Sequence, residues 1–278
     1  MYIKRDDLIH PEISGNKWRK LKYNFEYAIE NALSEVITFG GAYSNHIAAT
    51  AAAANHFGIK STGIIRGDEL NENSNPTLQQ AAKDGMNFRF LSREDYRKLK
   101  TDLNLLKAQF PNAYIIPEGG TNELAIQGAS EIIQELHIDF DVIITAIGTG
   151  GTMAGLIRGL RGKKEVLGIS SLKGDFMKTE MRDLLQNMQI SHSNFEVLTN
   201  FHFGGYGKCP STLIDFINQM KKEINMLFDP IYTAKALFGV WEMITNGRFD
   251  GQTLVFLHTG GLQGIAGFNQ KSSQKIHI

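Results

Sequence analysis

The chain of 278 residues has no formal net charge, because 29 lysines and arginines balance 29 aspartates and glutamates. A neutral chain has no strong field to attract nucleic acid or an anionic membrane surface, so we expect a small-molecule partner. The single cysteine, Cys209, excludes an intrachain disulfide and a cysteine-based zinc site, and it favours a reducing cytoplasm. No signal peptide and no apolar run of membrane-spanning length is visible.

Short apolar runs alternate with helical patterns along almost the whole chain, which is typical of an α/β protein with mainly parallel sheets. Strands are predicted in two series, at 36–39, 62–65, 88–91 and 114–116, and at 142–147, 166–170, 195–198 and 254–257. Helices are predicted at 16–33, 45–57, 76–84, 92–110, 123–136 and 153–160.

The length exceeds that of a usual single domain, so two domains are expected. The two series of strands predict two open, twisted sheets, one in each domain. We place a small domain at 30–122 and a large domain at 1–29 together with 123–278. Since no linker rich in proline, serine or glycine separates the two series, the domains are expected to pack closely around a cleft.

The stretch Gly15-Asn16-Lys17 introduces an amphipathic helix with one apolar stripe. Ser14 or Asn16 can cap this helix, which leaves Lys17 in its first turn. The positive end of the helix dipole disfavours a protonated amine there and so favours the neutral nucleophile. A solvated surface charge is the more common explanation of a single lysine, so the helix alone does not decide the role of Lys17.

The first glycine turn follows the strand at 36–39 and runs from Gly40 to His46. Ser44 and Asn45 fall at the start of an alanine-rich helix, where unpaired backbone N–H groups and the dipole can hold a carboxylate or a phosphate. The structural alternative is an ordinary helix N-cap, for which serine and asparagine are strongly preferred.

The second glycine turn, Gly148-Thr149-Gly150-Gly151-Thr152, follows the strand at 142–147. Its glycines allow the backbone to approach an anion closely, and its two hydroxyls add donors, so it predicts a phosphate cradle. It is neither a dinucleotide fingerprint, because Met153 occupies the third glycine position, nor a Walker loop, because no Gly-Lys-Ser/Thr follows. A glycine turn with a structural role only is the alternative.

Three later motifs add polar groups to the list of candidates. Tyr206 lies between two glycines, Asp229 can cap a helix that places Tyr232 and Thr233 in its opening turns, and Thr259 follows a strand. No His-Glu-x-x-His pattern is present and Ser44 is not in a Gly-x-Ser-x-Gly elbow, which argues against metal and serine hydrolysis.

Together these parts suit a pyridoxal-phosphate enzyme, and over nearly its whole length the chain resembles one family of them. This is the 1-aminocyclopropane-1-carboxylate deaminase/D-cysteine desulfhydrase family, of fold type II, with a tryptophan synthase β-like fold. The matching motifs are Lys4-Arg5-Asp6-Asp7, Gly15-Asn16-Lys17, Arg19-Lys20-Leu21, Ser44-Asn45-His46, Pro117-x-Gly119-Gly120, Gly148-Thr149-Gly150-Gly151-Thr152-x-Ala154-Gly155, Gly205-Tyr206-Gly207, Asp229-Pro230-x-Tyr232-Thr233 and His258-Thr259-Gly260-Gly261.

The resemblance implies that pyridoxal 5'-phosphate is the cofactor and that Lys17 is its covalent anchor. Asn45 would contact the ring hydroxyl, and Thr259 would meet the pyridine nitrogen. The residues of the second glycine turn would bind the phosphate; they are Gly148, Thr149, Gly150, Gly151 and Thr152.

For the substrate, a small amino acid, the resemblance implies that Ser44 and the backbone of Asn45 and His46 hold the carboxylate. Tyr206 and Tyr232 would face the substrate. Lys17, or another base such as Ser44, would remove the α-proton before a β-substituent leaves and a 2-oxo acid and ammonia are released. The resemblance also implies a homodimer.

Two departures from the family pattern matter. In the deaminase branch the residue after the counterpart of Tyr232 is glutamate, which favours a protonated ring nitrogen, whereas this chain has the neutral Thr233. We therefore favour D-cysteine desulfhydrase-like elimination over ring opening of 1-aminocyclopropane-1-carboxylate. A non-catalytic homologue that binds pyridoxal phosphate is the rival from another class.

The second departure is that the chain starts about thirty residues later than longer relatives, which is one or two elements of typical size. We expect either a start upstream or a trimmed large domain.

Overall fold

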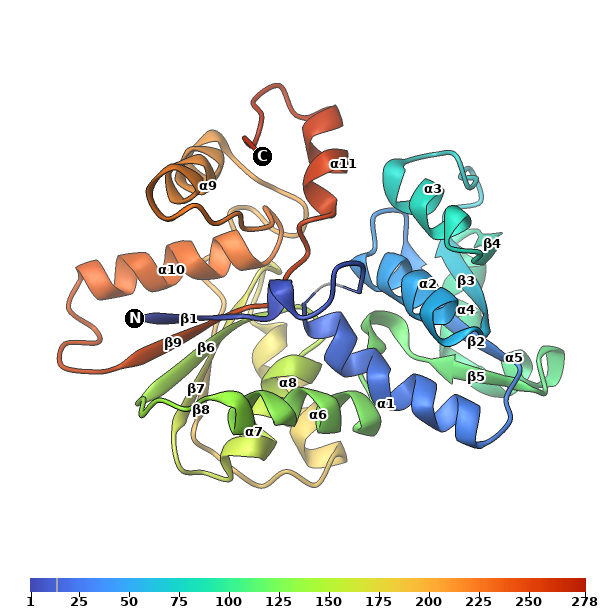
Figure 1. Ribbon diagram of the computed structural model, residues 1–278, viewed down its shortest axis with the longest axis horizontal. Coiled ribbons are helices and arrows are strands. Elements are labelled where there is room, and N and C mark those ends of the chain that lie inside the picture. The colour runs from blue at the N-terminus through green and yellow to red at the C-terminus, as the bar shows by residue number, and fades with distance from the viewer. Residues whose placement is uncertain (14) are drawn as a thin grey trace.

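The computed structural model describes residues 1–13 and 15–278, and Ser14, one of the two predicted helix caps, lies outside them. Two parallel sheets organise the described chain, a larger one with the N-terminal strand at one edge and a smaller one beside it (Figure 1). The predicted α/β class with two mainly parallel sheets is confirmed. All eight predicted strands are present, with shifts of one or two residues at some ends.

The large sheet has the strand order β1-β9-β6-β7-β8. Its strands are β1 (Tyr2–Arg5), β6 (Val142–Ile147), β7 (Glu165–Ser170), β8 (Phe195–Leu198) and β9 (Leu254–His258). Strand β1 was not predicted, because its sequence is short and polar. It lies at the edge of the sheet and pairs with β9, from Tyr2 opposite Val255 to Arg5 opposite His258, and an edge strand does not need a continuous apolar run.

The small sheet has the order β4-β3-β2-β5. Its strands are β2 (Glu35–Gly41), β3 (Lys60–Arg66), β4 (Asn87–Leu91) and β5 (Ala113–Ile116). Its central strand β2 is buried along Val36–Gly40, as expected for a parallel strand covered on both faces.

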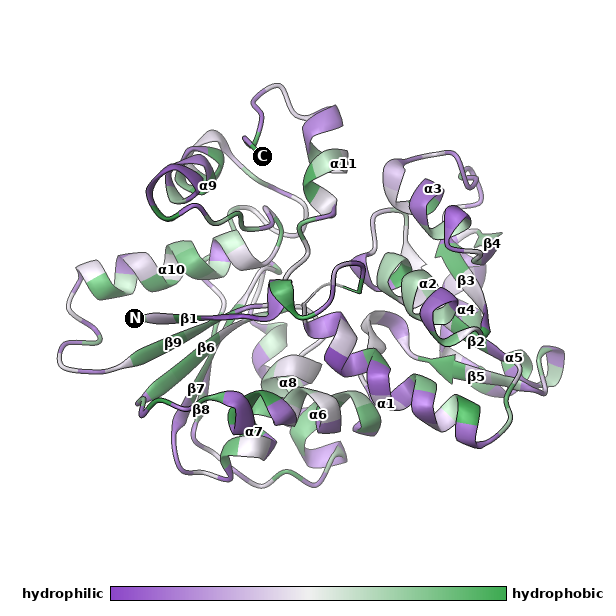
Figure 2. Ribbon diagram, in the orientation of Figure 1, coloured by the Kyte–Doolittle hydropathy of each residue, from purple (hydrophilic) through white to green (hydrophobic). Residues whose placement is uncertain are grey.

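Helices cover both faces of the large sheet (Figure 1). On one face lie α9 (Ser211–Ile224), α10 (Thr233–Thr245) and α11 (Gly264–Lys271), and on the other α6 (Glu123–Ser130), α7 (Gly151–Leu160) and α8 (Phe176–Asn187). Figure 2 shows the hydrophobic colour along β6, β7 and β9 between these layers, where the apolar core lies. No helix within residues 1–13 and 15–278 is long and apolar enough to cross a membrane.

The small sheet is covered by α2 (Asn45–Phe57) and α3 (Pro76–Lys83) on one face and by α4 (Arg93–Thr101) and α5 (Leu103–Gln109) on the other. The single helix predicted at 92–110 is wrong. Asp102 leaves the helical conformation, with φ −108° and ψ 79°, and its carboxylate accepts the N–H of Leu105 at 3.2 Å. A new helix therefore starts there, because the side chain of Asp102 competes with the helical backbone bonds. The helix predicted at 123–136 likewise ends at Ser130 and continues as a 3₁₀ helix, Glu131–Glu135.

Helix α1 (Asn16–Glu30) joins the two halves. Its residues Leu21, Phe25 and Ala28 pack in one apolar cluster with β2 and α2, while its opposite side lies against α6. It ends three residues earlier than predicted. The residue at its N-cap is Gly15, with φ 68°, which has no side chain to cap the helix, so the predicted cap by Asn16 is wrong.

Arg19 fixes the first half of α1 through buried hydrogen bonds. Its buried guanidinium donates two hydrogen bonds to Asp6, at 2.6 and 2.9 Å, and two to Glu135, both at 2.8 Å. The bonds from Arg19, together with Lys4, lower the pKa of Glu135 to about 2. Arg19, two residues after Lys17, thus links α1 to Asp6, which follows β1, and to the 3₁₀ helix after α6.

We predict that Gly128→Ala destabilises the fold. Alanine normally stabilises an exposed helix by about 1 kcal/mol relative to glycine. Here a Cβ at position 128 would lie 1.9 Å from the carbonyl oxygen of Arg19, so α6 and α1 would have to separate. We expect a loss of about 1–3 kcal/mol or more in the free energy of unfolding, measured by urea denaturation.

Gln127→Ala, on the exposed side of the same helix, is the matched control and should change the free energy of unfolding by less than about 0.5 kcal/mol. Equal stability of the Gly128→Ala and Gln127→Ala variants would show that α1 and α6 are not in tight contact.

Candidate active site

Both sheets have a point where the strand order reverses, and ligands of open α/β sheets bind beyond the carboxyl ends of the strands at such points. In the large sheet this point lies between β6 and β9, so it brings together the second glycine turn and Thr259. In the small sheet it lies between β2 and β5, so it brings together the turn before α2 and the residues Pro117–Gly120. Helix α1 starts between these two points (Figure 1).

Lys17 lies in the first turn of α1, directly beyond a close backbone contact. The N–H of Asn16 donates to the carbonyl oxygen of Thr259 at 3.2 Å, and a Cβ at Gly15 would lie 1.9 Å from the same oxygen. The start of α1 is therefore fixed against the end of β9. Part of the Lys17 side chain is accessible to solvent, yet burial of its amine lowers the pKa to about 8. A lysine with this pKa has a far larger neutral, nucleophilic fraction at pH 7 than an ordinary lysine.

Lys20, one turn after Lys17 on the same side of the helix, is a site residue to which the sequence reasoning gave no role. Its ammonium donates to the carbonyl oxygen of Gly119 at 2.8 Å and to the hydroxyls of Thr121 and Thr149 at 3.0 and 3.3 Å. Burial and the neighbouring Lys17 cation lower the pKa of Lys20 well below its usual value. Lys20 could have been recognised from the sequence by its spacing of three residues from Lys17, since residues i and i+3 share a helix face.

The second glycine turn lies directly against these basic groups. Gly150 has the left-handed φ of 80°, and α7 begins at Gly151, two residues earlier than predicted. A Cβ at Gly151 would lie 3.0 Å from the ammonium of Lys20, and Thr152 accepts the side-chain amide of Asn16 at 2.8 Å. The turn therefore combines a helix N-terminus, nearby hydroxyls and a buried cation, which are the donors that a phosphate requires.

The turn before α2 lies on the other side of Lys17. Ser44 is the N-cap of α2 and accepts the N–H of Ile47 at 3.3 Å, so the ordinary capping role is present. Asn45 packs against the loop that follows β9 in the large sheet, because a Cβ at Gly261 would lie 3.0 Å from its side-chain nitrogen. The helix start thus meets the loop that follows Thr259.

His46 points its side chain into the interior. It is 2% exposed, and its Nε2 lies 2.8 Å from the hydroxyl of Thr38. Since the Thr38 hydroxyl donates its proton to the carbonyl oxygen of Ile116, the bond requires a proton on Nε2 of His46. Burial and the nearby cations of Lys17 and Lys20 lower the pKa of His46 well below its usual value, so the ring is neutral.

Tyr206 and Tyr232 form a pair at the edge of the site. Their ring centroids lie 5.9 Å apart with an angle of 63° between the planes, and 51% of Tyr206 is exposed. A Cβ at Gly148 would lie 3.1 Å from the ring of Tyr232, so the pair adjoins the second glycine turn. Burial, and then the neighbouring Tyr206, raise the pKa of Tyr232 well above its usual value, and its phenol stays protonated.

Helix α10 starts at Thr233, so Tyr232 lies just before it and not in its opening turn as predicted. The predicted cap by Asp229 is wrong, because Tyr232 is the N-cap residue; the carboxylate of Asp229 instead organises the turn before the helix by accepting the N–H groups of Ile231, Tyr232 and Thr233. The hydroxyl of Thr233 donates to the Asp229 carboxylate at 2.7 Å and accepts the N–H of Asp229 at 2.8 Å. The proton of the Thr233 hydroxyl is therefore committed to Asp229.

Thr259 is held in place by the residue before it. The Nδ1 of His258 accepts the N–H of Gly260 at 3.2 Å, while its Nε2 lies 2.6 Å from the carbonyl oxygen of Leu227. These two bonds require a neutral ring with its proton on Nε2. Burial lowers the pKa of His258, which favours this neutral form, and the ring stacks on Phe228. The hydrogen bonds of His258 thus fix the backbone of the loop after β9, which passes Gly15.

The predicted site residues therefore meet at one place, although they come from both sheets. Three basic groups are close together here, because the charge of Lys17 lowers the pKa of Lys20, and the charges of both lysines lower the pKa of His46. Within residues 1–13 and 15–278, none of the three forms a salt bridge with a carboxylate. A cluster of uncompensated basic groups beside a glycine turn fits a phosphate monoester bearing an aldehyde.

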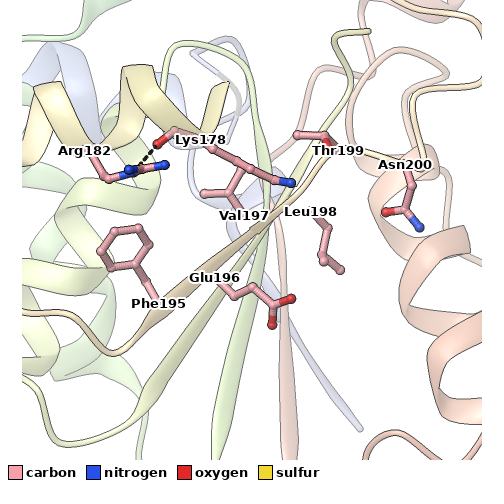
Figure 3. Close-up of a pocket in the computed structure, with 8 residues that line it drawn as sticks. All are labelled: Lys178, Arg182, Phe195, Glu196, Val197, Leu198, Thr199 and Asn200. Atoms are coloured by element: carbon pink, nitrogen blue, oxygen red, sulfur yellow. Dashed lines mark hydrogen bonds between the residues drawn. The ribbon is translucent and has the colours of Figure 1, made fainter. Parts of the chain in front are cut away.

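A separate hollow of about 620 Å³ lies along edge strand β8, at the opposite edge of the large sheet from β1 (Figure 3). Its lining side chains come from α8, β8 and the residues just after β8: Lys178, Arg182, Phe195, Glu196, Val197, Leu198, Thr199 and Asn200. None of the predicted site residues lines it.

Comparison with known proteins identifies the class of enzyme. The family described as "Pyridoxal-phosphate dependent enzyme" matches residues 1–260. This match and the fold define a pyridoxal-phosphate dependent enzyme of fold type II, and pyridoxal phosphate is its cofactor.

Two relatives show to which family of pyridoxal-phosphate dependent enzymes the chain belongs. The bifunctional D-cysteine desulfhydrase/1-aminocyclopropane-1-carboxylate deaminase of Arabidopsis thaliana is 31% identical over 294 residues, which cover 95% of this chain and 73% of the relative. The crystal structure of an ACC deaminase homologue has a TM-score of 0.80 and 28% identity, covering 94% of this chain and 84% of that one. The chain belongs to the 1-aminocyclopropane-1-carboxylate deaminase/D-cysteine desulfhydrase family.

A more distant structure shares the fold alone. Serine racemase from Dictyostelium discoideum has a TM-score of 0.68 at 14% identity, covering 94% of this chain and 86% of that one. At this identity the likeness carries no argument about substrate.

We predict that Lys20→Met weakens binding of pyridoxal phosphate. The variant removes a buried cation beside the second glycine turn, and a hydrogen bond to a charged group contributes about 1.5–3 kcal/mol. The dissociation constant should rise by roughly tenfold or more, measured by equilibrium dialysis of the cofactor.

Lys22→Met is the matched control, because Lys22 lies on the same helix but pairs with Glu131 at the surface. The same dissociation constant for the Lys20→Met and Lys22→Met variants would exclude Lys20 from the cofactor site.

Proposed function

We propose that the enzyme catalyses β-elimination from a small amino acid that carries a leaving group on its β-carbon, in the manner of D-cysteine desulfhydrase. One water is consumed, and the products are the released β-substituent, a 2-oxo acid and ammonia. The observation that carries this proposal is the bonding of Thr233. Where the resemblance places glutamate in the deaminase branch, this chain has a hydroxyl whose proton is committed to Asp229.

A hydroxyl bonded in this way cannot give a proton to the ring nitrogen, and it brings no negative charge that would favour a protonated nitrogen. The remaining neighbour proposed for that nitrogen is Thr259, which is also neutral. A cofactor ring with neutral partners withdraws electrons less strongly. This is sufficient for elimination, in which a β-substituent leaves with its electron pair, and it suits ring opening less well.

The proposed cofactor contacts follow from the groups that surround Lys17. Lys17 would be the covalent anchor, and Lys20 with the second glycine turn would bind the phosphate. Asn45 would contact the ring hydroxyl, and Thr259 the ring nitrogen. When bound, pyridoxal phosphate supplies an electron sink for the negative charge that develops when the α-proton leaves.

The proton steps are assigned to the side chains of this chain. A pKa of about 8 leaves about a tenth of the Lys17 amine neutral at pH 7, which makes it our first candidate for the base that removes the α-proton. Ser44 is the second candidate. The N–H groups of Asn45 and His46 at the start of α2, with the Ser44 hydroxyl, would hold the substrate carboxylate.

The two tyrosines are proposed to face the substrate side chain. Because burial raises the pKa of Tyr232, its phenol is a hydrogen-bond donor at neutral pH. Tyr206, which is half exposed, would cover the site from the solvent side. Both are suited to bind a polar leaving group or to donate a proton to it.

Ring opening of 1-aminocyclopropane-1-carboxylate is the second candidate, since the name of the Arabidopsis thaliana relative joins both activities. The division into a domain at 30–122 and a domain at 1–29 with 123–278 is also proposed; it is supported by the position of β2 to β5 inside the first range. A homodimer is proposed on the family resemblance alone, and a cytoplasmic location on the single cysteine.

The substrate class is tested by measuring release of 2-oxo acid from D-cysteine, β-chloroalanine, serine and 1-aminocyclopropane-1-carboxylate with the purified holoenzyme. We expect turnover of one or more of the three β-substituted amino acids at a higher kcat/KM than that of the cyclopropane. Lys17→Ala is the control and should lower the rate by at least about 10²–10⁴-fold, as loss of a general base does. Ring opening without elimination would reverse the assignment.

A further inference from the structure

Lys235 is a fully buried lysine that the proposed chemistry does not use. It lies in the first turn of α10, three residues after Tyr232, and 0% of its surface is exposed. Both its burial and the positive end of the helix dipole disfavour a cation there, and burial lowers its pKa to about 8. Within the described chain, residues 1–13 and 15–278, it forms no salt bridge.

Its ammonium binds the backbone of the 202–208 loop, which carries Tyr206. It donates to the carbonyl oxygen of His202 at 3.0 Å and to that of Gly205 at 2.9 Å. The same two carbonyls close two consecutive turns. His202 accepts the N–H of Gly205 at 3.0 Å, and Gly205 accepts the N–H of Lys208 at 3.1 Å. The ammonium of Lys235 therefore binds the carbonyl oxygens that accept the closing hydrogen bonds of both turns.

The backbone of the 202–208 loop is unfavourable to order, because it combines flexible glycines with a strained residue. Phe203 has a left-handed φ of 53°, and the glycines at 204, 205 and 207 have φ values of 92°, 118° and 74°. Glycine loses more conformational freedom on ordering than any other residue, and a left-handed phenylalanine is strained. The ring of Phe203 packs edge-on against Phe238, with centroids 5.0 Å apart, which anchors the beginning of the loop.

The part of the loop around Tyr206 is mostly exposed, although the Tyr206 ring lies edge-on to that of Tyr232. Gly204, Tyr206, Gly207 and Lys208 are exposed, and only Gly205 between them is buried. The carbonyl of Gly205, immediately before Tyr206, is the one that Lys235 binds. Lys235 is thus the buried side chain that fixes the peptide from which Tyr206 extends.

We propose that Lys235 is a positioning residue that holds the 202–208 loop so that the phenol of Tyr206 stays beside Tyr232 at the substrate. The inference rests on the proposed function, in which Tyr206 faces the substrate. Lys235 acts through the loop and does not itself touch the substrate.

The first test measures the loop directly, without any catalytic activity. In the holoenzyme, Lys235→Met keeps a long apolar side chain in the cavity but removes both hydrogen bonds. We expect trypsin to cleave after Lys208, and chymotrypsin after Tyr206, about tenfold faster or more, because local opening becomes easier. Lys222→Met, an exposed lysine on α9, is the control and should leave both cleavage rates unchanged.

The second test is a double-mutant cycle on kcat/KM for elimination. Lys235→Met should lower kcat/KM by about tenfold when Tyr206 is present and by less than about twofold when Tyr206 is already replaced by phenylalanine, because the two residues act together. An unchanged cleavage rate, or an equal loss of kcat/KM in both backgrounds, would overturn the proposal.

The two tests separate failure of this inference from failure of the proposed function. If no substrate is eliminated by the unmodified enzyme, the proposed function fails, and the cleavage rates still decide whether Lys235 holds the loop. If Lys235→Met does not accumulate as folded protein, Lys235→Gln replaces it. Its shorter amide cannot reach both carbonyls, so the same faster cleavage is expected and an unchanged rate contradicts the proposal.

Discussion

The position of Lys17 depends on one close backbone contact, between the start of α1 and the end of β9. Only glycine fits at position 15, because a Cβ there would overlap the carbonyl oxygen of Thr259. The bond from the N–H of Asn16 to that oxygen then sets the direction of the helix. Arg19 fixes the next turn through Asp6 and Glu135, so Lys17 lies between two points that cannot shift independently. The neutral ring of His258 orients the partner strand end in turn.

This arrangement brings three basic side chains close together in a buried place, where their charged forms are unfavourable. Lys17, Lys20 and His46 all have lowered pKa values, because burial disfavours their charged forms; repulsion from Lys17 lowers the pKa of Lys20 further, and repulsion from both lysines lowers that of His46. In the proposed site, a dianionic phosphate beside Lys20 would relieve this repulsion, and the same surroundings would leave a fraction of the Lys17 amine neutral for covalent attachment. The proposed cofactor contacts would then couple cofactor and fold through electrostatics as well as through shape.

Features with a local signal were predictable from the sequence, and features set by distant partners were not. Strand β6 and the glycine turn after it are read from an apolar run and three glycines within eleven residues. In contrast, β1 is too polar to be recognised, and the break at Asp102 depends on one side chain competing with the helix. Lys20 and Lys235 look like ordinary lysines in the sequence. Their partners lie about a hundred and about thirty residues away, so only the fold reveals them.

The central claim is that Lys17, and not its buried neighbour Lys20, is the covalent anchor of the cofactor. Treating the cofactor-loaded protein with borohydride makes the lysine–pyridoxyl bond permanent, and peptide mapping by mass spectrometry then locates it. We predict that the pyridoxyl group is found on Lys17 and that Lys20, three residues further along α1, is unmodified. A pyridoxyl group on Lys20, or on any lysine other than Lys17, would contradict the account.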